Sequence, residues 1–137
     1  MIELSGINVV AVIVAWFVNI GLGSFWYSPA GFGKLWSKLS GVDMMKMPKE
    51  LANKAIVSVA IASLVQTVVL AIIVNSLRVS EIGQAVLLGL LLWAGFTAAT
   101  TVGNNLYSRL SWNFWWLNAS FFLIVIVLNT VLLTVWS

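Results

Sequence analysis

The sequence predicts an all-α polytopic membrane protein, a bundle of four transmembrane helices with an amphipathic interfacial helix in the first loop. Of its 137 residues, 61% are hydrophobic and only 8% are charged, whereas soluble domains carry roughly a quarter charged residues. Four runs lack Asp, Glu, Lys and Arg altogether, and each exceeds the about 20 residues that a helix needs to cross a bilayer. These runs are residues 4–33, 55–77, 82–108 and 110–137. We therefore exclude a soluble globular protein and expect a single transmembrane domain over residues 1–137.

The four predicted spans follow these runs in order. We place them at about residues 5–27, 51–76, 83–107 and 114–136, with a loop at 28–50. The first span ends before Pro29, because a proline ring is incompatible with the interior of a helix. Helices are the expected spanning form, since the strands of a barrel would alternate in polarity over segments of about ten residues.

The first loop contains a helical pattern of a different kind, with apolar side chains on one face and polar or small ones on the other. The apolar set is Phe32, Leu35, Trp36, Leu39 and Val42. We expect this helix to lie in the membrane interface, where Lys34 and Lys38 would face anionic headgroups. Trp26, Tyr27 and Trp36 would sit at headgroup level. A simple connector, lipid recognition and docking of a partner are all consistent with this pattern.

Lys and Arg are unevenly distributed between the two sides of the predicted bundle. The first loop and its flank hold five lysines, the loop at 108–113 adds Arg109, and the opposite side has only Arg78. The five lysines are Lys34, Lys38, Lys46, Lys49 and Lys54. By the positive-inside rule, loops 28–50 and 108–113 are predicted to be cytoplasmic and both termini outside, in a multi-pass protein of the cell (inner) membrane.

The residue types that are missing restrict the chemistry. The chain has no Cys and no His, which are the usual ligands of zinc, haem and iron–sulfur clusters, so we expect no cofactor and no metal site. A serine nucleophile would also lack its usual histidine base, so we expect no enzyme. No ionisable residue lies in the middle of a span, which disfavours proton-coupled transport. The net charge of +3 indicates lipid headgroups as partners and no nucleic acid, because the lysines flank membrane spans.

The spans carry amides and hydroxyls in place of charges. Unpaired polar groups are costly in hydrocarbon, so we expect these side chains to point inward, where they could line a polar cavity. The candidates are Asn19, Gln66, Thr97, Thr100, Thr101, Asn104, Asn118 and Asn129. Alternatively, they only pack helices together, with the hydroxyls bonded to carbonyls of their own helix.

A row of small residues, Gly95, Ala99 and Gly103, lies on the other face of the third span. This spacing lets two helix backbones approach closely. We therefore expect the row to be a packing face, either within the bundle or between subunits of an oligomer.

Three short motifs carry a family resemblance. The first is Trp-Tyr-Ser-Pro at residues 26–29 followed by Gly-Phe-Gly-Lys-Leu-Trp at 31–36. The other two are Leu-Trp-Ala-Gly-Phe at 92–96 and Leu-Asn-Ala at 117–119. In these motifs the chain resembles the DUF1761 family, small four-span membrane proteins of bacteria and archaea whose function is unknown. The resemblance covers nearly the whole chain and implies a prokaryotic four-helix membrane protein, but no activity. Relatives commonly continue with Gly-Tyr-His where residues 120–122 here are Ser-Phe-Phe, so no role of that histidine carries over.

Three hypotheses for the function follow. The first is a non-enzymatic integral membrane protein whose helix bundle self-associates into a homo-oligomer or serves as a subunit of a membrane assembly. The alternative is a passive channel or uncoupled transporter for a small neutral or anionic solute, lined by the polar residues. The third is a pocket for a lipid or another hydrophobic ligand, framed by the interfacial helix.

Overall fold

The computed structural model describes residues 1–43 and 46–136, and this part of the chain contains helices and turns but no strand. Four of its helical segments are long and apolar enough to span a membrane. They are α1 (Val9–Trp26), α3 (Lys49–Ser76), the segment from Ile82 to Tyr107, and α6 (Trp112–Val135). The predicted all-α class with four spans is thereby confirmed.

The third span is one continuous segment with an irregular turn. It consists of α4 (Ile82–Trp93), the single π-helical turn η2 (Ala94–Ala98) and α5 (Ala99–Tyr107). A π-turn inserts one residue into an α-helix, so the faces of α5 are rotated relative to those of α4. Nothing in the hydropathy pattern predicts this turn.

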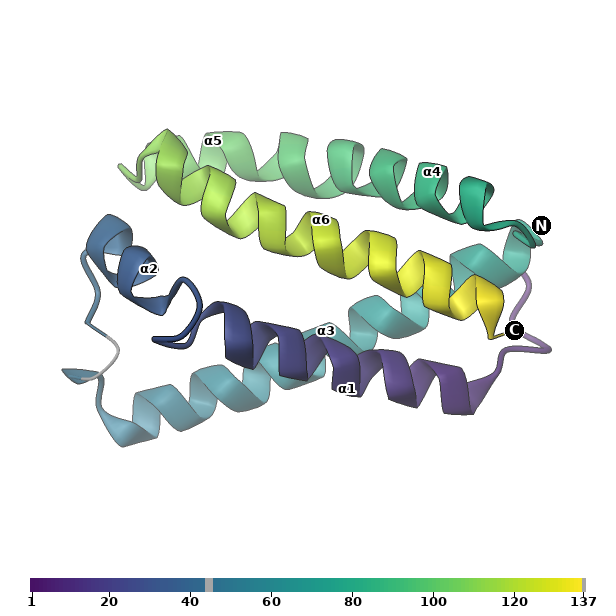
Figure 1. The fold of residues 1–137 in the computed structure, drawn as a ribbon, viewed down its shortest axis with the longest axis horizontal. Coiled ribbons are helices and arrows are strands. Elements are labelled where there is room, and N and C mark those ends of the chain that lie inside the picture. Colours follow the sequence, from purple (N-terminus) through teal and green to yellow (C-terminus); the bar gives the residue numbers. More distant parts are fainter. Residues whose placement is uncertain (44–45, 137) are drawn as a thin grey trace.

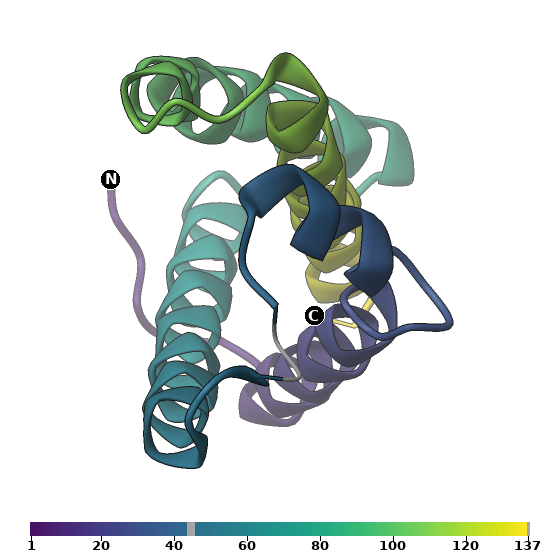
Figure 2. The ribbon, with the colours of Figure 1, turned by 90° about the vertical axis from the view of Figure 1, so that its left-hand side faces the viewer.

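Helix α6 is the centre of the bundle (Figure 1). The segment α4–α5 lies on one side of α6, and α1 and α3 lie on the other, where they also pack against each other. Figure 2, a view along the bundle, shows α3 crossing the direction of α1. Between Leu51 and Ala62 almost every residue of α3 is exposed, whereas Leu70, Ala71 and Val74 near its other end are buried. Helix α3 is therefore part of the core only in its second half.

The two ends of the bundle differ. Both termini lie at one end (Figure 1), together with the turn after α3, and we call this the terminal end. The opposite end holds α2 (Gly33–Ser40) and the turn between α5 and α6, and we call it the α2 end. The structure thus groups the loops as the predicted topology does.

The segment before α1 is fastened to the end of α3. The backbone N–H of Glu3 donates to Ser76 Oγ at 2.7 Å, and Asn75 Nδ2 donates to the carbonyls of Glu3 and Ser5, at 2.9 Å each. Hydrogen bonds from Ser5 also lower the pKa of the Glu3 carboxyl. Helix α1 begins only at Val9, later than residue 5, because the Asn8 side chain caps it by accepting from the N–H of Ala11 at 3.2 Å.

Helices α4 and α6 approach each other closely at a glycine. Ala85 and Gly89 of α4 are both buried. A Cβ added to Gly89 would lie 2.8 Å from Thr130 Oγ1 and 2.9 Å from the Cα of Val127. Only glycine fits at position 89, because a side chain there would collide with α6.

Residues 27–33 fold back over the last turn of α1. The backbone N–H groups of Gly31 and Gly33 both donate to the Ser28 carbonyl, at 3.0 and 2.9 Å, and that of Phe32 donates to the Trp26 carbonyl. A Cβ added to Gly31 would collide with the Phe25 carbonyl oxygen, and one added to Gly33 with that of Tyr27. The two glycines are therefore needed for space, and the turn that they permit carries α2 across the end of the bundle.

Helix α2 packs against the beginning of α6. The Trp36 ring lies 6.3 Å from that of Phe114 and 6.5 Å from that of Tyr27, between ring centroids. Trp36 and Leu39 of the predicted apolar face are half-buried, whereas the other three members of that face are exposed. Within the predicted loop 28–50, residues 44 and 45 lie outside the described residues.

Candidate functional site

A cavity of about 320 Å³ lies between α5 and α6 at the α2 end. Seven hydrogen-bonding side chains line it: Tyr27, Thr97, Thr101, Asn104, Asn105, Ser108 and Asn118. Its apolar walls are Leu110, Phe114, Trp115, Ala119 and Phe122. No Asp, Glu, Lys or Arg is among the described residues that line this cavity, so its polarity comes from neutral groups.

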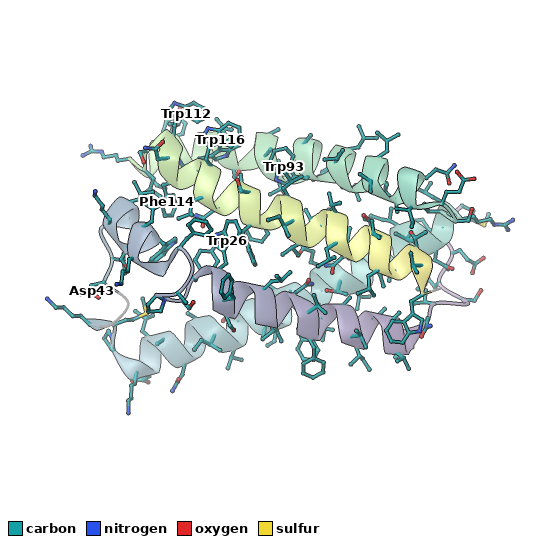
Figure 3. All side chains as sticks on the ribbon, in the orientation of Figure 1. Trp26, Asp43, Trp93, Trp112, Phe114 and Trp116 are labelled. Atoms are coloured by element: carbon teal, nitrogen blue, oxygen red, sulfur yellow. The ribbon has the colours of Figure 1, made fainter. Side chains whose placement is uncertain are left out.

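Two tryptophans connect the third span to α6 near the cavity. Trp93 Nε1 donates to the Ala119 carbonyl at 2.8 Å, and Trp115 Nε1 donates to Thr101 Oγ1 at 3.0 Å. The small residues Ala98 and Ala119 pack with Trp115 in a buried cluster. In Figure 3 Trp93 lies between the third span and α6, whereas Trp112 and Trp116 lie at the beginning of α6. The two indole rings bridge the third span and α6 at this end, while Gly89 brings the two helices together towards the terminal end.

Some of the lining groups already have protein partners. Tyr27 Oη donates to Asn118 Oδ1 at 2.7 Å, which joins the end of α1 to α6. Thr101 Oγ1 donates to the Thr97 carbonyl at 2.7 Å and accepts from a tryptophan. Asn105 Nδ2 donates to the carbonyls of Leu110 and Ser111. These bonds fix the shape of the cavity.

Other lining groups are unused. Asn118 Nδ2, the Thr97 hydroxyl, the Asn104 amide and the Ser108 hydroxyl have no hydrogen-bond partner within the described part of the chain. All four belong to the lining of the same cavity. The site therefore offers several free neutral donors and acceptors to a ligand.

Four of the eight predicted cavity residues do not line this cavity. Thr100 is exposed and donates to the carbonyl of Phe96 at 2.8 Å. Asn19 is buried and donates to Thr67 Oγ1 of α3 at 3.1 Å. Gln66 is half-buried on α3, and Asn129 is fully buried on α6. The reason is the packing order: α1 and α3 contact α6 on the side away from α5, so their amides cannot meet those of α5.

Three side chains have buried polar atoms without a protein partner. Both side-chain polar atoms of Asn129, Asn19 Oδ1 and Trp26 Nε1 have none among the described residues. Burying an amide without a hydrogen bond costs about 1–3 kcal/mol by protein mutational data. The bundle is held together by its other contacts in spite of these groups.

The row of small residues faces outward. Gly95, Ala99 and Gly103 are all exposed, and a Cβ added to either glycine would meet no atom within 4 Å. On the helical wheel the row lies opposite Thr97 of η2 and the residues of α5 that line the cavity, Thr101, Asn104 and Asn105. Within the described chain no helix packs on it.

The residues predicted to contact headgroups fall into two groups. Trp26 is half-buried, with its ring 4.6 Å from that of Phe32 and 5.8 Å from that of Phe121, and Figure 3 shows it between α1, α2 and α6. It therefore belongs to the aromatic packing of the bundle. Lys34 and Lys38 are exposed at the α2 end. Tyr27, which we predict at headgroup level, lines the cavity between α5 and α6. No sequence signal separates an inward tyrosine from an interfacial one.

A second cavity, of about 180 Å³, lies at the terminal end. Asn8, Asn75, Arg78 and Trp136 are among its lining residues. It shares no lining residue with the cavity between α5 and α6. Four members of the buried apolar core, Ala11, Ala71, Val74 and Leu133, are also among the residues that line this second cavity.

Four helices long and apolar enough to span a membrane define a multi-pass helical membrane protein, and a neutral polar cavity lies between the third of these spans and α6. The family described as "Protein of unknown function (DUF1761)" matches residues 10–134, nearly the whole chain, and the chain belongs to this family. This confirms the resemblance in its sequence motifs. Neither the curated proteins nor the solved structures include a significant match.

Proposed function

We propose that this protein is a non-enzymatic membrane bundle that self-associates through the outward face of its third span. The observation that carries the proposal is the row Gly95, Ala99 and Gly103, which is exposed and has open space above both glycines. Helices in lipid gain little from burying apolar surface, so close backbone contact at small residues is a main source of their association. A second copy of the chain is the partner that we propose for this face.

The same span supports the proposal by its own intramolecular packing. On α4, Ala85 and Gly89 use small-residue spacing to bring a neighbouring backbone within contact. The outward row has the same four-residue spacing and begins about one and a half turns after Gly89. No described helix packs against it. Thr100 is exposed beside the row and offers a hydroxyl for an additional bond between subunits.

Replacing both Gly95 and Gly103 by leucine is expected to lower the oligomeric fraction at least tenfold. The leucine side chains would hold two helix backbones apart and remove the close contact. The measurement is light scattering coupled to size exclusion in detergent, together with energy transfer between labelled copies in vesicles. The matched control is Gly21→Leu, because Gly21 is an exposed glycine of α1 that also has open space above it. A monomeric wild type, or a double variant with unaltered size, would contradict the proposal.

We also propose that the α2 end faces the cytoplasm of a prokaryotic cell membrane. Six of the seven Lys and Arg residues lie at or next to this end. Because the chain has no cysteine, single cysteines can be introduced without background. An impermeant maleimide on intact cells is expected to label Ser80→Cys, and to label Lys38→Cys at least tenfold less until the cells are opened. Both positions are exposed, so the reverse pattern, or equal labelling, would contradict this orientation.

The arrangement of the cavities favours a bundle over a passage for solutes. The two cavities lie at opposite ends, and no residue lines both. A channel or transporter would require a second arrangement of α1, α3 and α6 that joins them. The non-enzymatic assignment rests on the absence of histidine and cysteine from the sequence.

A further inference from the structure

We propose that the cavity between α5 and α6 binds an uncharged amphiphile, a molecule with hydroxyl or ester oxygens at its head and a hydrocarbon tail. The head would occupy the polar part of the cavity, and the tail would leave it towards the membrane. This binding site lies on the face of α5 opposite the row of small residues and is independent of self-association.

The depth of the cavity restricts its ligand. Helix α6 has 24 residues, so at 1.5 Å per residue it is roughly 36 Å long, against about 30 Å of hydrocarbon. A centred helix would place Asn118, six residues after Trp112, roughly 6 Å inside the hydrocarbon boundary. Asn118 thus lies below the level of lipid phosphates, whereas Ser108, which follows the last residue of α5, lies nearer the headgroups.

The free groups favour oxygen atoms on the ligand. Asn118 Oδ1 is engaged by Tyr27, so the group that Asn118 has left is its amide donor. The Thr97 and Ser108 hydroxyls and the Asn104 amide add further donors. In a membrane an unpartnered donor is costly, and a hydroxyl or ester oxygen would satisfy it.

The absence of charge in the lining indicates a neutral head. A carboxylate or phosphate at this depth costs several kcal/mol unless a cation balances it. Arg109 follows Ser108 in the chain, but it is exposed and does not line the cavity. The basic side chains of the α2 end therefore do not supply the countercharge that an anionic head would need inside the cavity.

Size and shape indicate that the ligand has a tail. At about 320 Å³, the cavity is near the lower limit of the roughly 300–1,000 Å³ of small-molecule pockets. It has room for a small head group and the beginning of one chain. Phe114 and Phe122 provide apolar wall beside the polar groups, and Phe122 is 36% exposed, so the apolar side of the cavity reaches the surface of the bundle.

The test uses the full chain in phosphatidylcholine vesicles with a diazirine-bearing monoacylglycerol as the probe. After illumination, the modified peptides are mapped by mass spectrometry. We expect the label to concentrate on residues 97–122, and unlabelled monoolein to reduce it at least fivefold. Glycerol and oleate at the same concentration are expected to leave it unchanged. If glycerol competes as strongly as monoolein, the cavity is a site for a small polar solute. If oleate competes more strongly than monoolein, the cavity is a site for an anion. Either result would overturn the proposal.

Variants separate binding in the cavity from general contact with lipid. Asn118→Leu and, independently, Thr97→Val are expected to lower the labelling of residues 97–122 at least threefold, since each removes a free group of the cavity. Thr100→Val is the matched control, because Thr100 is exposed on the same helix, outside the lining, with its hydroxyl bonded to its own helix. The double variant Gly95→Leu and Gly103→Leu should still be labelled on residues 97–122, even if its oligomeric state changes. Labelling that is equal on all spans, or unaffected by both cavity variants, would refute the site.

Discussion

Gly89→Val is expected to lower the free energy of unfolding of the bundle by about 2–3 kcal/mol, at the upper end of the usual cost of overpacking a core. A first side-chain carbon at Gly89 would already be 2.8 Å from Thr130 Oγ1 and 2.9 Å from the backbone of Val127. Because the Cα of Val127 is part of the obstacle, rotation of the Thr130 and Val127 side chains alone cannot relieve it. Helix α4 would have to move away from α6 at the place where Gly89 brings the two helices into contact.

The measurement for Gly89 is the midpoint of unfolding in a detergent titration, followed by tryptophan fluorescence. Gly95→Val is the matched control, since Gly95 lies in the same span and has open space above it. That variant is expected to unfold within about 0.5 kcal/mol of the wild type, as surface substitutions usually do. Equal destabilisation by the two variants would mean that valine disturbs the helix itself and that the contact of α4 with α6 is not limiting.

These two glycines illustrate what a sequence pattern can determine. The charge-free runs predicted four spans because the length and polarity of a spanning helix are set by the bilayer itself. The pattern also marked Gly95 as a packing residue, but it did not mark Gly89, where an added Cβ would lie 2.8 Å from a side chain of α6. Periodicity identifies a face of a helix, and only the fold tells which neighbour, if any, covers that face.

The same limit explains the outcome for the polar residues. Thr97, Thr101 and Asn104 line one cavity because they share the third span, whose helical geometry fixes their spacing. Asn19 and Gln66 were assigned to the same cavity, yet they lie on helices that pack on the other side of α6. Their place depends on the order of helices around α6, and no single-helix pattern contains that order.

The motif at residues 26–36 has a structural explanation that its sequence alone did not reveal. The last carbonyls of a helix have no partner within the helix and need other donors. Here the N–H of Phe32 donates to the carbonyl of Trp26, the last residue of α1, and the N–H groups of Gly31 and Gly33 donate to the Ser28 carbonyl within the turn. The glycines have ordinary φ angles, so what they provide is absence of a side chain and not unusual backbone freedom.

Gly33→Ala is therefore expected to destabilise the α2 end by about 2–4 kcal/mol, the sum of overpacking against backbone and the loss of one or two hydrogen bonds. The added Cβ would collide with the Tyr27 carbonyl and lie 2.8 Å from the carbonyl carbon of Ser28. To avoid it, the turn would leave the end of α1, and α2 would lose the contact of Trp36 with Phe114. Trypsin should then cut at Lys34 and Lys38 at least tenfold faster, because local unfolding limits cleavage within a helix.

The consequence would reach the cavity, because Tyr27 belongs to the same turn and bonds to Asn118. Displacement of Tyr27 would open that side of the lining, so Gly33→Ala should also weaken the binding of the monoacylglycerol probe. Gly21→Ala serves as the control, since Gly21 has open space above it and lies within α1. Unchanged proteolysis in Gly33→Ala would show that the turn tolerates a side chain there. If proteolysis is faster but the probe still binds fully, the turn is not needed for ligand binding. The Tyr27–Asn118 hydrogen bond would then contribute only to the stability of the bundle.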